Sequence, residues 1–432
     1  MKMANMDDYF DVVIVGTGAA GLYCALNLPA RYRILLLTKQ KADESDSFLA
    51  QGGICMQHGE ADYRPFFDDT MRAGHYENNP ATVDLMIRSS NSIIRDLVHR
   101  GVRFARDDHG ALRFTREGAH SRPRILFHED ITGHEITQTL LNEVLRCENI
   151  ELREHTTLLD FFADASACGG VIAAGPDGEP RAIGAGAVVL ACGGIGGLYK
   201  NSTNFPHITG DAIAMALRHG VACEHLDYIQ IHPTTLYSRR KGRRFLISES
   251  VRGEGALLLD KNGNRFTNEL QPRDVVSAAI RAQMEKDGTD HVWEDMRPIG
   301  EAAIREHFPN ILERCEEEGY DPIHEPIPVV PAQHYFMGGI TADLSSRTAL
   351  PRLYACGETC CNGVHGRNRL ASNSLLESLV FAQRAADDIL YGEPPVFTGD
   401  KPDLAPYREQ EPLFAAYRQE VLTAIERSKN HE

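Results

Sequence analysis

The chain has 432 residues, of which 42% are hydrophobic and 25% charged, and its formal net charge is −16. This composition is that of a globular protein with enough apolar residues for two or three domains. The acidic balance argues against nucleic-acid binding, and the one short basic run, residues 239–244, is expected to be a solvated loop. No apolar stretch reaches the length of a membrane span and no signal peptide is recognised, so we expect a soluble, cytoplasmic protein.

The N-terminal segment predicts a strand, a glycine turn, a helix and a second strand, at residues 9–15, 16–21, 22–28 and 34–38. Its turn reads Gly16-x-Gly18-x-x-Gly21, a dinucleotide-binding pattern. The first glycine allows the tight turn, the second lets the backbone approach a pyrophosphate, and the third lets helix and strand pack closely. The pattern does not separate FAD from NAD. The second strand ends in Thr38-Lys39 and lacks the usual acidic residue.

The rest of the chain alternates helix-like and strand-like patterns. Helices are predicted at residues 80–100 and 133–146 and from about Ser374, and strands at residues 151–162, 170–174, 187–192 and 353–356. Pro176-Asp177-Gly178 marks a turn between strands. Residues 225–335 are richer in charge and indicate an inserted second domain. A last amphipathic helix carries Leu413, Tyr417, Val421 and Ile425 on one face.

Two further segments favour a flavin. The small-residue loop Ser47-Phe48-Leu49-Ala50-Gln51-Gly52-Gly53 would let the backbone approach an isoalloxazine ring. Gly357-Glu358 follows a predicted strand, so Glu358 would bind a ribitol hydroxyl. The helix opened by Asn373-Ser374-Leu375 would face the pyrimidine end of the flavin.

Scattered polar residues suit a dicarboxylate, which needs two anion-binding groups. Arginine binds carboxylates through two parallel hydrogen bonds, and histidine adds a donor whose charge varies near neutral pH. Taken singly, an arginine is more often a surface or ion-paired residue and a histidine more often a structural one. The candidates are Glu117, Gln230, His232, Ser248, Glu249, Arg252, Arg273, His334 and Arg369.

The ten cysteines form no disulfide framework. Cys356, Cys360 and Cys361 lie close together in the sequence, and either a redox or metal element or reduced core residues would explain them. The core interpretation is preferred, and no metal is predicted.

Together these residues resemble the L-aspartate oxidases, within the succinate dehydrogenase/fumarate reductase flavoprotein family. The resemblance runs from about Asp11 to about Leu390. Its most specific strings are Ala50-Gln51-Gly52-Gly53, His232-Pro233-Thr234, Arg252-Gly253-Glu254-Gly255, Pro272-Arg273-Asp274, His334-Tyr335 with Gly338-Gly339, and Arg369 with Ala371-Ser372-Asn373-Ser374-Leu375. Relatives that attach FAD covalently carry a histidine shortly before Gln-Gly-Gly. Asp46 stands at that position, so the resemblance implies noncovalent FAD.

The resemblance also implies roles for matching residues. Gln230, His232, Ser248, Glu249, Arg252, His334 and Arg369 would line the substrate pocket, Arg273 would act as acid or base in the fumarate-reducing direction, and Glu117 would meet the α-ammonium group that succinate lacks. The expected FAD contacts are Gly16, Thr17, Gly18, Ala19, Ala20, Gly21, Lys39, Ser47, Ala50, Gln51, Gly52, Gly53, Asp211, Glu358, Ser374 and Leu375.

The implied fold is α/β: a Rossmann-like FAD-binding domain (residues 1–225 and 336–395), an inserted α+β capping domain (226–335) and a short C-terminal helical remnant (396–432). The longer relatives carry a C-terminal helical domain, and one helix of it is expected here. Ser248 stands where the family commonly has threonine, and Ile231 where phenylalanine is commoner before the histidine. The hydroxyl is retained, so we expect little change in the pocket.

The implied activity is oxidation of L-aspartate to iminoaspartate, the first step of NAD biosynthesis from aspartate. Oxygen or fumarate would accept the electrons, and quinolinate synthase would use the product. One alternative is a soluble fumarate reductase or succinate dehydrogenase flavoprotein, which would share nearly every substrate-binding residue. Another is a non-enzymatic flavin-carrying electron-transfer subunit, which needs no dicarboxylate pocket. Glu117 and the absence of the attachment histidine favour the oxidase.

Overall fold

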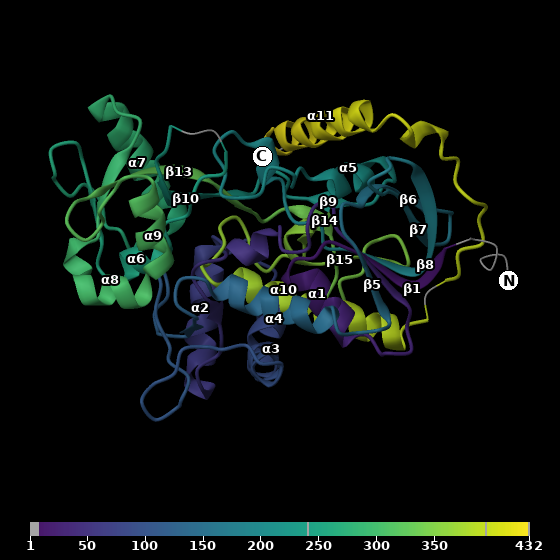
Figure 1. Cartoon of the computed structure of the whole chain (residues 1–432), viewed down its shortest axis with the longest axis horizontal. Helices are drawn as coiled ribbons and strands as arrows, with labels where there is room; N and C mark the ends of the chain where they lie inside the picture. Colours follow the sequence, from purple (N-terminus) through teal and green to yellow (C-terminus); the bar gives the residue numbers. More distant parts are fainter. Residues whose placement is uncertain (1–7, 240–241, 394, 431–432) are drawn as a thin grey trace.

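The protein is described by a computed structural model that covers residues 8–239, 242–393 and 395–430. Its centre is a seven-stranded sheet in the order β5-β2-β1-β8-β7-β6, with β15 also paired to β8 (Figure 1). The strands are β1 (Tyr9–Val15), β2 (Ile34–Leu37), β5 (Ile150–Arg153), β6 (Thr157–Ala163), β7 (Cys168–Ala174), β8 (Pro180–Leu190) and β15 (Leu353–Ala355). The late strand β15 therefore joins a sheet built from the first half of the chain.

The sheet is parallel through β5, β2, β1, β8 and β15, as the strand–turn–helix–strand pattern predicts. β7 runs antiparallel to both of its neighbours, β6 and β8. The connection from β7 to β8 turns at Gly178, where φ is 74°, and it is too short for the helical crossover that parallel strands need. The strand predicted at residues 151–162 is in fact two strands, β5 and β6.

Helices cover both faces of this sheet because alternate strand residues point to opposite sides. Val12 and Ile14 of β1 face one core and Val13 and Val15 face the other. The first core is closed by α1 (Ala19–Asn27), α3 (Pro80–His99), α4 (Thr132–Val144) and α10 (Asn373–Tyr391). The second is closed by α5 (Asp211–Arg218) and α11 (Gln410–Lys429), and Figure 1 shows α11 lying outside α5.

A second unit has its own sheet and core, at the left of Figure 1. Its antiparallel strands are β10 (Ile229–Leu236), β13 (Ile327–Phe336), β12 (Val292–Asp295) and β11 (Leu257–Leu259). Its helices are α6 (Glu249–Gly253), α7 (Arg273–Asp287), α8 (Glu301–His307) and α9 (Pro309–Glu317). Apart from Phe336 at the end of β13, the unit falls within the stretch predicted as the capping domain, and the domain boundaries themselves stay a prediction.

Short elements complete the fold. They are α2 (Tyr63–Ala73), the paired strands β3 (Ile54–Cys55) and β4 (Ile125–Leu126), and the small sheet of β16 (Cys360–Cys361), β14 (Gly339–Thr341) and β9 (Cys223–Glu224). In the described part of the chain, no helix combines the length and apolarity that crossing a bilayer requires. All ten cysteines are free, and Cys356 and Cys360 are buried in the two cores, as the core interpretation predicts.

The last amphipathic helix is confirmed as α11, because Tyr417, Val421 and Ile425 are buried in the second core. The helices predicted at residues 80–100 and 133–146 correspond to α3 and α4. Of the basic run, Arg240 and Lys241 lie outside the described residues.

Candidate active site

A cavity opens where the carboxyl ends of the parallel strands meet the second unit. Its wall includes residues that directly follow four strands: Gly16 after β1, Thr38 after β2, Ala191 after β8 and Cys356 after β15. The opposite wall comes from β10, α6, α7 and β13. Ligands of open parallel sheets bind outside the carboxyl ends of the strands. The fold therefore brings the predicted cofactor and substrate residues to one cavity.

The glycine turn after β1 leaves no room for a side chain. Gly16 has a φ of 115°, and a Cβ there would lie 2.0 Å from the carbonyl oxygen of Ala191. A Cβ on Gly21 would lie 2.0 Å from the carbonyl oxygen of Gly16. The turn directs the N-terminus of α1 at the cavity, where free N–H groups and the helix dipole favour an anion.

The predicted cofactor contacts lie along this half of the cavity. Ala19 and Gly21 stay behind the lining, and the other predicted contacts form part of it. The Ala19 N–H donates to the Ser47 Oγ at 3.0 Å, which joins the small-residue loop to α1. Lys39 Nζ donates to Asp211 Oδ2 at 2.7 Å, so these two charges pair at the cavity wall.

Two half-buried carboxyl groups line the same half. Glu358 accepts the Phe336 N–H at 2.9 Å, and Asp46 accepts the Phe205 N–H at 2.9 Å. Burial, and then the charge of Asp46, raises the pKa of Glu358 well above its usual range. Burial raises the pKa of Asp46 to about 7.

Several buried polar atoms of this wall have no protein partner among the described residues. They are the Ser45 Oγ, the Asp46 Oδ2 and the Gln51 Oε1. Buried polar atoms are normally hydrogen-bonded, so this wall suits a polar ligand. With the glycine turn and the helix N-terminus beside it, the wall fits the expected FAD.

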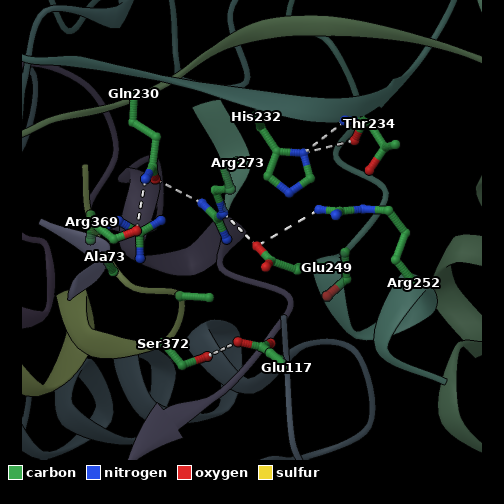
Figure 2. Close-up of polar contacts among 12 residues, drawn as sticks. Ala73, Glu117, Gln230, His232, Thr234, Glu249, Arg252, Arg273, Arg369 and Ser372 are labelled. Carbon is green, nitrogen blue, oxygen red and sulfur yellow. Dashed lines mark hydrogen bonds and ion pairs between the residues drawn. The ribbon is translucent and has the colours of Figure 1, made fainter. Parts of the chain in front are cut away.

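In the other half of the cavity, Arg273 of α7 is held by two side chains (Figure 2). Its Nε donates to Glu249 Oε2 at 2.5 Å and its Nη1 to Gln230 Oε1 at 2.8 Å. The Gln230 Nε2 donates to the Arg369 carbonyl at 2.8 Å and to Asn368 Oδ1 at 2.9 Å. Gln230 is thus bonded to protein on every side and stays outside the cavity lining, so its position is that of a support for Arg273.

Arg252 of α6 lies behind Glu249. Its Nη1 donates to the Glu269 carbonyl at 2.6 Å, and its Nη2 lies 3.7 Å from Glu249 Oε2. Burial alone would raise the pKa of Glu249, but the charges of Arg273 and Arg252 outweigh it and lower that pKa. Arg252 does not line the cavity either, whereas Ser248, Glu249 and Arg273 do.

Two histidines from neighbouring strands face this group. The rings of His232 on β10 and His334 on β13 meet edge to face with centroids 5.1 Å apart. Burial, and then the charge of Arg273, lowers the pKa of both rings well below the usual range. Both are therefore neutral at neutral pH. Thr203 Oγ1 lies 2.8 Å from His334 Nδ1, while His232 Nε2 has no hydrogen-bond partner among the described residues.

Arg369 is buried just before α10. Its Nη1 donates to Ser374 Oγ at 3.1 Å, its guanidinium lies 4.6 Å from the centre of the Tyr335 ring, and its Nε has no partner among the described residues. Burial, and then the charge of Arg273, lowers the pKa of Arg369 to about 10. Two buried cations that disfavour each other's charge form a site that an anionic ligand would stabilise.

Glu117 approaches from the FAD-binding side, opposite His232 in Figure 2. Its Oε1 accepts from Ser250 Oγ at 2.9 Å and its Oε2 from Ser372 Oγ at 2.6 Å. Burial, and then the charge of Glu249, raises the pKa of Glu117. A Cβ on Gly52 would lie 2.5 Å from Glu117 Oε1, so the glycine loop makes space for this carboxylate.

Sequence reasoning missed some residues of the site. Ser250 and Ser372 contact Glu117, and Thr203 contacts His334. A serine near the start of a helix usually indicates a cap, which conceals any other role. Arg243 of the basic run was expected in a solvated loop; it is exposed, yet it also lines the cavity.

Known proteins resemble this chain over most of its length. The family model described as FAD binding domain matches residues 11–375. An L-aspartate oxidase of Clostridium perfringens is 48% identical over 88% of this chain and 86% of that protein. One from Nostoc sp. is 44% identical over 98% of this chain and 76% of that protein. Among solved structures, a quinol-fumarate reductase with menaquinol molecules is 32% identical with a TM-score of 0.84, covering 95% of this chain and 75% of that chain.

Proposed function

The chain belongs to the L-aspartate oxidases of the succinate dehydrogenase/fumarate reductase flavoprotein family, and from this premise we propose that it oxidises L-aspartate to iminoaspartate. The observation that carries the proposal is the buried group formed by Arg273, Arg369 and two neutral histidines, with the carboxylate of Glu117 facing it. The two arginine cations suit the carboxylates of a dicarboxylate substrate, and the Glu117 carboxylate suits the substrate's amino group. The reaction would be the first step of NAD biosynthesis from aspartate.

The substrate carboxylates would be held by side-chain nitrogens that have no hydrogen-bond partner among the described residues. Arg369 offers its Nε, and His232 offers its Nε2. His232 Nδ1 lies 3.0 Å from the Thr234 carbonyl oxygen and 3.2 Å from the Thr234 nitrogen, and Nε2 can donate only in the tautomer that carries the hydrogen there. Both histidines would bind the substrate in their neutral forms, because their pKa values lie well below the usual range. Binding should therefore not depend on histidine protonation near neutral pH.

Glu117 would hold the ammonium group, and Arg273, paired with Glu249, would move a proton to or from the dicarboxylate. Oxidation removes the Cα hydrogen with its electron pair and one proton from nitrogen. FAD supplies the acceptor for that electron pair when it is bound. The protein's contribution is to fix the substrate carbon in place and exclude water.

The proposal is tested by mixing the purified, FAD-loaded protein anaerobically with L-aspartate and following the visible absorbance of the flavin. We expect L-aspartate to bleach the flavin and succinate to leave it oxidised, because only L-aspartate pairs an ammonium group with Glu117. Bleaching by succinate alone would instead assign the chain to the dehydrogenase type. Bleaching by neither would leave the oxidase proposal without support.

Glu117→Gln is expected to lower kcat/KM for L-aspartate by roughly 10- to 100-fold, the cost of losing one charge-assisted contact. Fumarate carries no ammonium group, so its reduction by a reduced dye should change by less than about 3-fold. Steady-state kinetics with both substrates on the same FAD-loaded preparation measures this difference. Equal losses would remove the ammonium role from Glu117.

A soluble fumarate reductase or succinate dehydrogenase activity is the second candidate, favoured by the similarity to solved quinol fumarate reductases. It would use the same cations and histidines. The noncovalent state of FAD, expected because Asp46 replaces the attachment histidine, is a further difference. Acid precipitation should release the flavin into the supernatant, and flavin retained in the pellet would contradict the expectation.

The partners follow from the chemistry. Oxygen or fumarate would reoxidise the flavin, and quinolinate synthase would use the iminoaspartate. A cytoplasmic location is supported by ten free cysteines, since disulfides are rare in reducing compartments.

A further inference from the structure

Both oxygens of Glu117 are occupied by serine hydroxyls that come from different parts of the chain. Ser250 lies in α6 of the second unit, and Ser372 lies directly before α10. Their Oγ atoms are 2.9 and 2.6 Å from Oε1 and Oε2 of Glu117. Neither hydroxyl has an assigned role in the proposed reaction. Both are hydrogen-bonded to the Glu117 carboxylate, which the reaction would use to bind the substrate's ammonium group.

The direction of the hydrogen bond from Ser372 is fixed by its neighbour. The Gly53 N–H lies 3.2 Å from Ser372 Oγ, and an N–H can only donate. The Ser372 oxygen is therefore the acceptor there, which leaves its hydrogen for Glu117 Oε2. Ser372 thus acts as a donor to the carboxylate.

A second chain of hydrogen bonds ends on the other oxygen in the same direction. The Ser250 N–H donates to Ser248 Oγ at 3.2 Å, the arrangement of a helix cap. The Ser248 hydroxyl donates in turn to Ser250 Oγ at 3.2 Å, and Ser250 donates to Glu117 Oε1. Each chain starts at a backbone N–H, so both hydroxyls present hydrogen to Glu117.

Donors on both oxygens stabilise an ionised carboxylate and oppose a protonated one. Burial and the charge of Glu249 on α6 act in the other sense and raise the pKa of Glu117. Arg273 on α7 lowers it, while the nearby Cys55 thiol of β3 stays neutral because burial raises its own pKa well above the usual range. The two hydroxyls therefore act against the desolvation of this group.

We propose that Ser250 and Ser372 are positioning residues that hold Glu117 as an ionised acceptor for the substrate's ammonium group, and thereby set the preference for amino dicarboxylates. This rests on the proposed oxidation of L-aspartate. Because the hydroxyls act through Glu117, the preference is a property of three residues from the loop before β4, α6 and the start of α10. Dicarboxylates without an amino group do not need the pair.

The test uses Ser250→Ala, Ser372→Ala and the double variant as FAD-loaded proteins. Each single change should raise KM for L-aspartate by roughly 3- to 10-fold, the net contribution of one ordinary hydrogen bond, because the hydroxyl acts on the substrate only through Glu117. Fumarate reduction by a reduced dye and the succinate Kd, read from the flavin spectrum, should stay within about 2-fold, because neither ligand has an ammonium group for Glu117 to bind. Ser250→Thr retains the hydroxyl and should restore the KM.

The pH profile separates this role from a general structural one. Without the donors the proton remains on Glu117 to higher pH, so the acidic fall of kcat/KM for L-aspartate should move to higher pH in the double variant. Ser277→Ala is the matched control. The Ser277 hydroxyl of α7 is buried and donates to the Ile231 carbonyl at 3.2 Å, so its removal should shift neither the KM for L-aspartate nor the pH of the acidic fall.

The outcomes distinguish this inference from the proposed function. Wild-type protein that does not oxidise L-aspartate would overturn both. If the wild type is active, equal losses of activity toward L-aspartate and fumarate in the serine variants would overturn the inference alone. So would an acidic fall of kcat/KM that stays at the wild-type pH in the double variant. Selective loss for L-aspartate with a shifted acidic fall, restored by Ser250→Thr, is the expected result.

Discussion

Replacement of Arg369 by leucine is expected to weaken succinate binding by roughly 30- to 1,000-fold, the cost of removing one partner of a buried charge contact. Arg369 is buried, its Nε has no partner among the described residues, and its charge lies close enough to Arg273 to be disfavoured in the free protein. A bound carboxylate relieves that repulsion. The loss of Arg369 therefore removes both the hydrogen-bond donors of its guanidinium and a positive charge that the carboxylate would neutralise. The succinate Kd, from the change in the flavin spectrum, measures the effect.

FAD should stay bound to Arg369→Leu, because the glycine turn and the Lys39–Asp211 pair belong to the other half of the cavity. The backbone also survives the change, since Gln230 bonds to the Arg369 carbonyl and not to its side chain. The ratio of flavin to protein absorbance checks retention.

Arg369→Lys is the matched control. It keeps the charge but loses the planar fork, so its succinate Kd should fall between wild type and Arg369→Leu. An unchanged succinate Kd in Arg369→Leu would remove this residue from the carboxylate site. Loss of FAD in both variants would show that the side chain supports the cofactor half instead.

The N-terminal half of the fold was predictable because its signals are local. The glycine turn and the buried runs specify β1, α1 and β2 with little help from distant residues. The second unit gave weaker signals for a physical reason. β10 contains Pro233, and β13 contains Pro328 and Pro331. Proline lacks the N–H that donates to a neighbouring strand, so these residues argue against a strand in the sequence. β10 accommodates its proline through an irregular register between His232 and Thr235.

The residue types of the site could be predicted from the sequence, but the contacts between those residues could not. Arginine, histidine and carboxylate residues were identified, yet Gln230 and Arg252 lie behind the lining rather than in it. The Lys39–Asp211 pair joins residues 172 positions apart, and the Glu117–Ser372 bond joins residues 255 apart. Such pairings depend on how the sheet and the second unit pack together. No local pattern in the sequence carries that information.

Arg273→Gln is expected to lower kcat for fumarate reduction by roughly 10²- to 10⁴-fold, the usual contribution of a positioned general acid. Glutamine retains a donor for Glu249 but cannot supply the proton or the charge. The succinate Kd should change much less, because Arg369 and the histidines remain. Single-turnover reduction of fumarate, with succinate titration alongside, separates the loss of chemistry from the loss of binding.

The same variant changes the electrostatics of the site in a direction that can be measured. Burial is the largest cause of the lowered pKa of His232, His334 and Arg369, and the charge of Arg273 lowers each further, so all three should become easier to protonate once that charge is removed. Succinate binding to Arg273→Gln should then strengthen as the pH falls, because histidines that were neutral gain charge. Arg273→Lys keeps a cation and should retain the flat wild-type profile. A full kcat in Arg273→Gln would overturn the acid–base assignment, and an unchanged pH profile would overturn the electrostatic one.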